Sequence, residues 1–219
     1  MKISAVGFDI DGTLYPNHRM FIHTFPSFIR HPMLVWHFSR IRKQIRKEEY
    51  HGDFHEKQTE LLAESMKISR TKAARILKEN LYDEWDNYFS RLKAYPYARD
   101  FILNLRMKGI KTAAMSDFPV GRKLEYLGLN DLWDAAFCTE ETGYLKPSPV
   151  PFSRMAELLK VENNQILYVG NNYKYDIIGA AEAGMKTAYL GRKKPGYSAD
   201  FYFESYKDLE KQLFSALQT

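Results

Sequence analysis

Two acidic residues, Asp9 and Asp11, stand two positions apart in the string FDIDGTLYP, directly after the apolar stretch from Ile3 to Phe8. This stretch predicts a short buried strand, so both carboxylates fall where the strand ends. Open α/β sheets bind their ligands at that end of their strands. Because buried carboxylates are costly unless they are paired or bound to a metal, the pattern indicates a functional site.

Polar residues follow three later apolar stretches in the same way. Ser116 and Asp117 follow IKTAAM, Lys146 lies in GYLKPSP, and Asn171 and Asp176 lie in VGNNYKYD. Parallel strands bring their carboxyl ends to one edge of a sheet. We therefore expect a single cleft that holds acids, a hydroxyl and an ammonium.

Such a set of groups suits phosphoryl transfer. One carboxylate can attack phosphorus and form an acyl phosphate, while a second acid protonates the leaving oxygen. An ammonium and a divalent ion can neutralise the charge that develops, and hard oxygen ligands beside phosphate indicate Mg²⁺. Gly12 lets the backbone turn sharply after Asp11 and expose its amides to a phosphate, and Thr13 can fix that loop.

The chain from residue 95 onward alternates helical and strand patterns. In order, the expected elements are a helix ending at Gly109, the strand IKTAAM, a helix near 122–127, the strand DAAFC, a helix over 149–159, the strand QILYVG, a helix over 174–183, the strand KTAYL, and a last strand and helix beyond Ala199. This alternation predicts an α/β fold, a Rossmann-like doubly wound parallel sheet with helices on both faces.

Residues 15–95 show helical periodicity instead. Apolar residues recur at helical spacing in two runs, which are Leu34, Phe38, Ile41 and Ile45, and then Leu77, Leu81, Trp85, Tyr88 and Leu92. Shorter helices are expected near 19–29 and over 54–66. The sequence thus predicts a catalytic core made of residues 1–14 and 96–219, interrupted by an α-helical bundle of residues 15–95 that caps it.

The net charge of +5 is unevenly distributed, since residues 15–47 carry seven Lys or Arg and no Asp or Glu. Five of them lie close together, namely Arg40, Arg42, Lys43, Arg46 and Lys47. One interpretation is a solvated face opposite the apolar residues of the same helix. The other is that some of them hold a charged or aromatic part of a substrate, assisted by Tyr15, Phe21 and Trp36. No nucleic-acid partner is expected, because no recognised binding motif accompanies these residues.

The cellular setting is predicted from what the sequence omits. A single cysteine, Cys138, excludes an internal disulfide, suits a reducing compartment and reads as a buried strand residue. No apolar run reaches 18 residues, and the N-terminus has no signal-peptide pattern. We expect a cytoplasmic protein with no membrane partner, while the oligomeric state is not determined by the sequence.

Taken together, four motifs resemble those of the haloacid dehalogenase superfamily, specifically its phosphatase-like members with a helical cap inserted after the first strand. FDIDGTL matches the first family motif, AMSD the second, the lysine of GYLKPSP the third and GNNYKYD the fourth. The motifs occur in order, each at a predicted strand end, and the resemblance extends from Ile3 to about Leu190.

The resemblance implies roles for the matching residues. Asp9 is the nucleophile and a metal ligand, and Asp11 is the acid/base, with its backbone carbonyl on the metal. Lys146 is catalytic, pairs with Asp9, and binds the phosphoryl group together with Ser116.

The resemblance also places Thr13 and Asp117 among the substrate-binding residues, and Asn171 and Asp176 among the ligands of Mg²⁺. The fourth motif usually reads Gly-Asp, so Asn171 replaces a carboxylate with an amide. An amide oxygen can still ligate Mg²⁺, but the site has one negative charge fewer, and weaker metal binding is expected.

The expected function is that of a magnesium-dependent phosphohydrolase that acts on a small organic phosphate monoester through an aspartyl-phosphate on Asp9. Asp11 favours phosphorus chemistry, because true haloacid dehalogenases lack the second acid and need no metal. A phosphomutase or phosphonatase of the same superfamily shares these motifs. Asn171 also leaves open a catalytically weak, phosphate-binding or regulatory relative. The physiological substrate, a small phosphorylated metabolite, is not specified by the sequence.

Overall fold

The computed structural model describes residues 2–48 and 52–218. Within these residues, six parallel strands form one sheet in the order β3-β2-β1-β4-β5-β6. The strands are β1 (Ala5–Asp9), β2 (Lys111–Ser116), β3 (Ala135–Cys138), β4 (Ile166–Gly170), β5 (Lys186–Leu190) and β6 (Phe201–Phe203). The chain order changes direction at β1, which lies between β2 and β4. Ligands bind beside such a reversal in open α/β sheets.

The central strands β1 and β4 are buried along their whole length, as their nearly continuous apolar sequences predict. The register pairs Phe8 of β1 with Ala114 of β2 and with Val169 of β4. Asp9 therefore stands level with the ends of both neighbouring strands, and the polar residues that follow these strands share one edge of the sheet.

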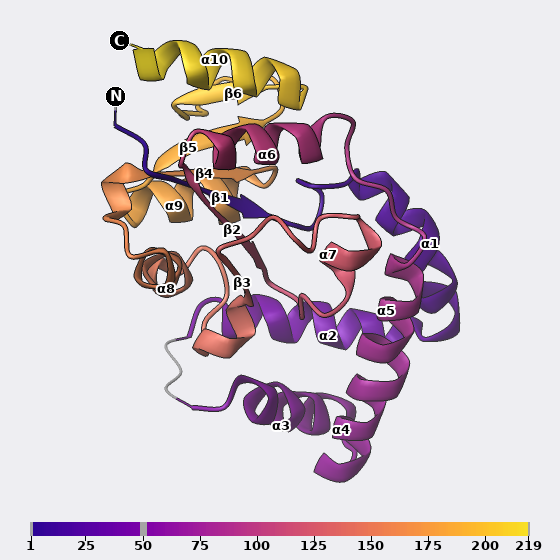
Figure 1. Cartoon of the computed structure of the whole chain (residues 1–219). Coiled ribbons are helices and arrows are strands. Elements are labelled where there is room, and N and C mark those ends of the chain that lie inside the picture. The colour runs from indigo at the N-terminus through magenta and orange to yellow at the C-terminus, as the bar shows by residue number, and fades with distance from the viewer. Residues whose placement is uncertain (1, 49–51, 219) are drawn as a thin grey trace.

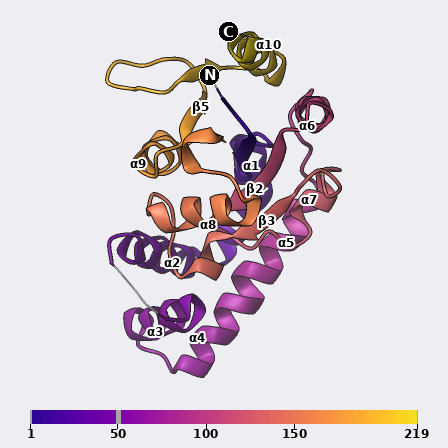
Figure 2. The same cartoon turned by 60° about the vertical axis from the view of Figure 1, so that its left-hand side comes forward.

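Helices cover both faces of the sheet (Figure 1, and in a turned view Figure 2). They are α6 (Ala98–Met107), α7 (Lys123–Tyr126), α8 (Pro149–Leu159), α9 (Gly179–Glu182) and α10 (Tyr206–Gln218), with short helical turns η2 (Thr139–Thr142), η3 (Asn163–Gln165) and η4 (Tyr173–Ile178). One core packs Phe8 against Phe101 of α6 and Tyr206 of α10, and a second core packs Ala5 against Met155 of α8. The predicted doubly wound α/β fold is confirmed.

Between β1 and β2 lies a helical segment, residues 17–89, which forms the lower and right-hand part of Figure 1. It contains α1 (Asn17–Arg30), α2 (Pro32–Ile45), α3 (Phe54–Met66), α4 (Arg70–Leu77), the π-helix η1 (Lys78–Tyr82) and α5 (Asp83–Phe89). Leu34, Phe38, Ile41 and Ile45 pack with Leu77 and Leu81 in a core of their own. The first predicted apolar run thus faces the start of the second, whereas Leu92, at the end of the second run, packs in the core of the sheet. The domain boundaries at residues 14/15 and 95/96 stay a prediction.

Two stretches form π-helices where periodicity predicts regular α-helices. η1 interrupts the run of residues 77–92, and η4 replaces the first part of the helix expected over 174–183. Apolar residues spaced by four, such as Leu77 and Leu81, fit either geometry, so the pattern does not distinguish them. None of the described helices has the length and apolar character needed to cross a membrane.

A buried tyrosine ties the last helix to the loop that carries the first motif. Tyr206 of α10 is almost fully buried, and its hydroxyl donates to the carbonyl oxygen of Thr13 at 2.8 Å. Tyr206→Phe is expected to lower the free energy of unfolding by about 1–3 kcal/mol, because it leaves a buried carbonyl without its donor. Urea unfolding measures this loss. Tyr97→Phe is the matched control, since the Tyr97 hydroxyl bonds Glu210 at the surface. An equal loss in both variants would contradict the assigned role of Tyr206.

Candidate active site

Asp9 ends β1, and the loop behind it folds back onto its carboxylate. The Thr13 hydroxyl donates to Asp9 Oδ2 at 2.6 Å. Gly12 allows this return with a φ of 91°, and a Cβ there would lie 2.2 Å from the side chains of Asn17 and Asn171. The glycine of the first motif is therefore required both by its backbone conformation and by close packing.

Lys146 lies between two carboxylates. Its ammonium donates to Asp9 Oδ1 and to Asp176 Oδ1, both at 2.6 Å, and to the Tyr168 hydroxyl at 3.3 Å. The pairing of Lys146 with Asp9 agrees with the geometry that the motifs imply. Asp176 reaches this position from η4, where Gly170 leaves room for it, since a Cβ on Gly170 would lie 2.3 Å from that of Asp176.

Two buried carboxylates that share one ammonium carry an excess of negative charge. Burial, which is the largest cause, and the neighbouring charges of Asp176 and Asp11 together raise the pKa of Asp9 to about 8, although Lys146 acts in the opposite direction. Burial alone would lower the pKa of Lys146, but Asp176 and Asp9 raise it well above its usual range. The ammonium of Lys146 therefore stays charged. Because one positive charge faces two carboxylates, the site attracts additional positive charge.

Asp11 lies in a different environment. It accepts hydrogen bonds from the Ser116 hydroxyl, from the Tyr15 hydroxyl at 2.5 Å, and from the Lys123 ammonium at 3.0 Å. Burial would raise the pKa of Asp11, but Lys123 and the Ser116 hydrogen bond hold it below its usual value. The two acids of the first motif thus differ in their electrostatic environment, since Asp9 lies beside a second carboxylate and Asp11 is surrounded by donors.

Lys123 is a site residue that the sequence analysis missed. It is 1% exposed although it belongs to a short helix, and its ammonium also lies 4.5 Å from the ring centre of Phe89. Nothing in the string GRKLEYLG distinguishes it from Arg122, which is exposed and pairs with Glu125. Tyr15 was considered only as an aid to substrate binding, and its contact with Asp11 was not foreseen.

The second motif divides its two polar residues between two partners. Ser116 faces Asp11, and its oxygen accepts from the Phe118 amide at 3.0 Å. Asp117 accepts from Arg46, the residue directly after α2, at 2.6 Å and from Thr139 at 2.8 Å. Substrate binding by Ser116 and Asp117 stays a prediction, and Asp117 already links the core to the helical segment.

The interpretation of the basic residues of α2 as a solvated face is wrong for two of them. Arg42 is 3% exposed and pairs with the buried Glu140, which also accepts from the Tyr82 hydroxyl at 3.1 Å. Arg46 pairs with Asp117 and donates to the Lys146 carbonyl oxygen at 3.0 Å. Their partners Asp117 and Glu140 follow β2 and β3, far away in the sequence. The spacing of apolar residues along α2 could therefore not predict these ion pairs.

The fourth motif places Asn171 beside the first. Its Oδ1 accepts a long hydrogen bond of 3.4 Å from Thr13, whose hydroxyl also bonds Asp9. No group of three or more His, Cys, Asp or Glu arranged to hold a metal occurs among the described residues. The available donors are instead the carboxylates of Asp9 and Asp176 and the amide oxygen of Asn171. This all-oxygen set, together with the raised pKa of Asp9, fits a divalent cation such as Mg²⁺.

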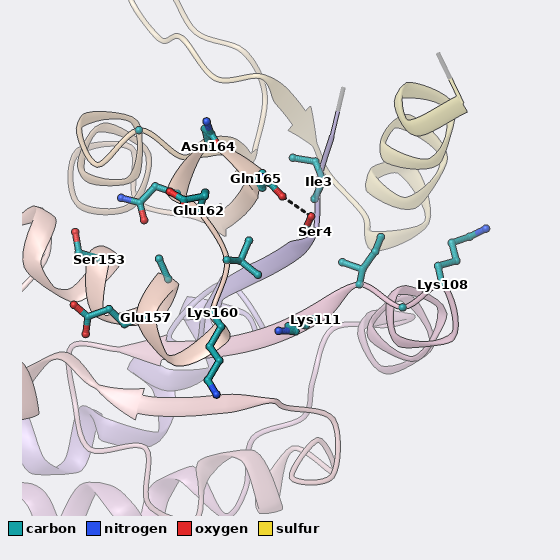
Figure 3. Close-up of a pocket in the computed structure, with 16 residues that line it drawn as sticks. Ile3, Ser4, Lys108, Lys111, Ser153, Glu157, Lys160, Glu162, Asn164 and Gln165 are labelled. Carbon is teal, nitrogen blue, oxygen red and sulfur yellow. Dashed lines mark hydrogen bonds between the residues drawn. The ribbon is translucent and has the colours of Figure 1, made fainter.

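A large hollow lies at the opposite edge of the sheet. It has a volume of about 1010 Å³ and is bordered by the starts of β1, β2 and β4, where Ser4 donates to Gln165 at 2.7 Å (Figure 3). It contains none of the predicted site residues. The carboxyl edge carries the acids, the two lysines and their hydrogen bonds, so we assign the candidate active site to that edge.

Residues 3–184 match the family of haloacid dehalogenase-like hydrolases. The chain belongs to this family. A haloacid dehalogenase-like relative, the glyceraldehyde 3-phosphate phosphatase of Methanopyrus kandleri, is 29% identical over 88% of this chain and 85% of its own. The pyrophosphatase PpaX of Bacillus thuringiensis is 24% identical over 95% of each chain. The resemblance and the enzyme class inferred from the four motifs are confirmed.

Solved structures of the family share the fold. The 2-haloacid dehalogenase of Pseudomonas syringae superposes with a TM-score of 0.70, covering 97% of this chain and 99% of its own at 20% identity. A phosphatase of the haloacid dehalogenase family from Thermococcus onnurineus gives 0.64, covering 97% and 98% at 21% identity. At these identities the likeness shows the architecture, and the chemistry has to be argued from the site.

The crowding of Asp9 predicts a pH-dependent gain of stability when its charge is removed. Its pKa in the folded chain, about 8, lies above the ordinary value of 3.8. The contribution of Asp9 to the stability of the wild type therefore falls as pH rises from about 4 to about 8. Asp9→Asn is expected to raise the free energy of unfolding by about 1–3 kcal/mol at pH 7 in the presence of a chelator, and by little at pH 4.

Urea unfolding of both proteins across this pH range measures the difference. Asp131→Asn is the control, because its hydrogen bond with Arg99 lowers the pKa of Asp131 at the surface. Asp131→Asn is expected to lower the free energy of unfolding at neutral pH, whereas Asp9→Asn is expected to raise it. A stability gap between wild type and Asp9→Asn that does not change with pH would refute the proposed crowding.

Proposed function

We propose that the protein is a magnesium-dependent phosphohydrolase that acts on a small organic phosphate monoester through an aspartyl-phosphate on Asp9. The observation that carries this proposal is the contrast between the two acids of the first motif, with Asp9 paired to Lys146 and Asp11 held by Ser116 and Lys123. Both relatives named above are phosphatases by name, one for a phosphorylated triose and one for pyrophosphate.

In the first half of the proposed reaction, an Asp9 carboxylate oxygen attacks phosphorus, and the bond from phosphorus to the leaving oxygen breaks. Asp11 gives a proton to that oxygen. Asp11 carries such a proton only when its donors are engaged elsewhere, and a bound phosphoryl group offers new acceptors to Ser116 and Lys123. Substrate binding thereby shifts Asp11 from the ionised to the protonated form.

In the second half, water attacks the phosphorus of the aspartyl-phosphate, and Asp11 accepts the proton of that water. The bond from phosphorus to Asp9 breaks, and inorganic phosphate leaves. Lys146 stays beside Asp9 throughout, where its charge favours the carboxylate as both nucleophile and leaving group. Thr13 keeps one carboxylate oxygen oriented by donating to it.

Asp9, Asp176, the Asn171 amide oxygen and the backbone carbonyl of Asp11 are the groups proposed to hold Mg²⁺. The ion supplies positive charge that neutralises the phosphoryl oxygens and the crowded carboxylates. Residues 15–95 are proposed to act as a cap that excludes water and selects the leaving group. Arg46 supports this role, because it extends from α2 to Asp117 and to the Lys146 carbonyl at the edge of the site.

Hydrolysis of a generic aryl phosphate, measured as phosphate release with and without Mg²⁺, tests the function. Asp9→Asn is expected to abolish both turnover and the trapped phospho-enzyme. Asp11→Asn is expected to slow turnover by a factor on the order of 10² to 10⁴, the usual contribution of general acid–base catalysis. Asp131→Asn, a surface substitution with the same charge change, is expected to keep wild-type turnover.

The outcomes separate the alternatives. Near-normal turnover by Asp9→Asn would reject the mechanism. If no aryl phosphate or metabolite in a panel is hydrolysed by the wild type, although phosphate binds, the catalytically weak relative suggested by Asn171 is the better description. Transfer of the phosphoryl group to a second hydroxyl of the substrate would identify a phosphomutase.

Asn171→Asp tests the metal site separately. Two unit charges about 4 Å apart gain roughly 4 kcal/mol of Coulomb energy in a partly screened site, and a carboxylate beside a divalent ion gains about twice that. Desolvation of the carboxylate cancels much of this gain. We expect magnesium binding to tighten by about tenfold, or about 1.4 kcal/mol. A magnesium titration of activity measures the change. Asn172→Asp adds the same charge one position along, but its side chain caps η4 by accepting from the Tyr175 amide. An equal shift in both variants would show that Asn171 is not a ligand.

A further inference from the structure

Helix α1 has its polarity reversed relative to an ordinary surface helix. The residues that it buries are Thr24 and Ser27, which bond the Met20 carbonyl and the Glu84 carboxylate. Four of the residues that it exposes are large and apolar, namely Phe21 (56% exposed), Ile22 (66%), Phe25 (60%) and Ile29 (67%). We call these four residues the α1 face.

The α1 face is continuous along the helix. Phe21 and Ile22 each lie three or four positions before Phe25, and Phe25 lies four positions before Ile29, so the four residues are neighbours on one side of the helix. Figure 1 shows α1 at the right-hand edge of the molecule, and α5 is the element that it packs against most extensively. Single exposed apolar residues are common in proteins, but a row of four on one helix marks an interaction surface.

Basic residues stand at both ends of this apolar row and on the helix that follows it in the chain. Arg19 and Arg30 are exposed on α1 itself, and Arg40 and Lys43 are exposed on α2. Residues 15–47 contain no acid, and Arg30 is paired with Glu84 of α5. Apolar side chains beside Lys and Arg on one helix are the combination that lies in the interface of an anionic membrane.

The exposed surface of α2 also combines an aromatic side chain with basic residues. Trp36 is 51% exposed, and the Arg40 guanidinium lies 4.6 Å from the centre of its ring. A hollow of about 740 Å³ between α2 and α3 opens beside them and is bordered by Lys43 and Lys47, with Glu64 as its acid. Trp is typical of membrane interfaces, and a hollow lined by several cations suits phosphate-bearing headgroups.

We propose that the α1 face docks on an anionic lipid bilayer, with its apolar side chains in the interface and the flanking Arg and Lys on the headgroups. A second copy of the chain is a weaker occupant, because a symmetric contact through the α1 face would bring the arginines of one copy toward those of the other. Peripheral docking needs no spanning helix. The chain would then act on its substrate while attached to a membrane surface.

Flotation of the full chain with vesicles tests the proposal. We expect binding to vesicles of phosphatidylcholine mixed with phosphatidylserine, weak binding to phosphatidylcholine alone, and loss of binding as salt is raised. Ile22→Ser with Ile29→Ser is expected to lower the partition coefficient at least about tenfold, because each side chain leaves the apolar interface. Met107→Ser with Leu158→Ser removes exposed apolar residues from α6 and α8 and is expected to leave it unchanged.

A second pair of variants tests the charges. Arg40→Gln with Lys43→Gln is expected to weaken binding to the anionic vesicles by a factor on the order of 20, given about fivefold per cation near the surface. Lys193→Gln with Lys194→Gln, exposed on the core, is the matched control and is expected to have little effect. Circular dichroism melting verifies that each variant folds.

Three results would overturn the proposal. They are failure of the wild type to float with anionic vesicles, equal losses in the α1 variants and their controls, and self-association in sedimentation that Ile22→Ser with Ile29→Ser abolishes. The last result would assign the α1 face to a second copy of the chain. Capture of an acidic protein without any flotation would also reject the lipid surface as its occupant.

Discussion

The Lys146 ammonium is the interaction on which the rest of the site depends. It is buried between Asp9, the last residue of β1, and Asp176 of η4, which follows the neighbouring strand β4. Without its charge, two carboxylates would stand together in a nonpolar interior, which folded proteins avoid. The loop after β1, the helical turn η4 and the strand ends are therefore held in mutual position by one cation.

This arrangement has a cost that is consistent with function. A site in which every charge was balanced would be more stable and would have less affinity for additional positive charge. The excess negative charge around Asp9 makes the folded chain less stable at neutral pH, and the same excess attracts a divalent ion. Asp11, only two residues away, is neutralised by Lys123 and forms hydrogen bonds to Ser116 and Tyr15. One short loop thus presents two carboxylates with opposite electrostatic tendencies.

Much of this could be predicted from the sequence, because the deciding features are local. Apolar runs of five or six residues, ended by acids or hydroxyls, identify β1, β2 and β4 and the residues that follow them. The sequence predicted a parallel α/β sheet but not the order of its strands, since no local pattern shows which strands pair. Asp9, Lys146 and Asp176 were found because each lies within a short motif at a strand end.

The residues that were missed depend on tertiary structure. Lys123 looks like any surface lysine of a short helix, and its burial results from the path of the chain between β2 and β3. Arg42 and Arg46 lie on the polar side of an amphipathic pattern, but Glu140 and Asp117 approach that side from distant loops. The reversed polarity of α1 is also hidden in the sequence, because periodicity finds an apolar stripe without showing whether it faces the core.

The two strands that pair with β1 come much later in the chain, so the central ladder of the sheet can form only after a long loop closes. The helical segment supplies most of that loop and has its own core around Leu34 and Leu81. Where it ends, the Tyr95 amide donates to the Leu14 carbonyl oxygen at 2.8 Å. A chain that collapses this segment first brings the two ends together and reduces the entropy lost on closure. The inserted helices therefore favour an order of folding in which they form before the sheet that they interrupt.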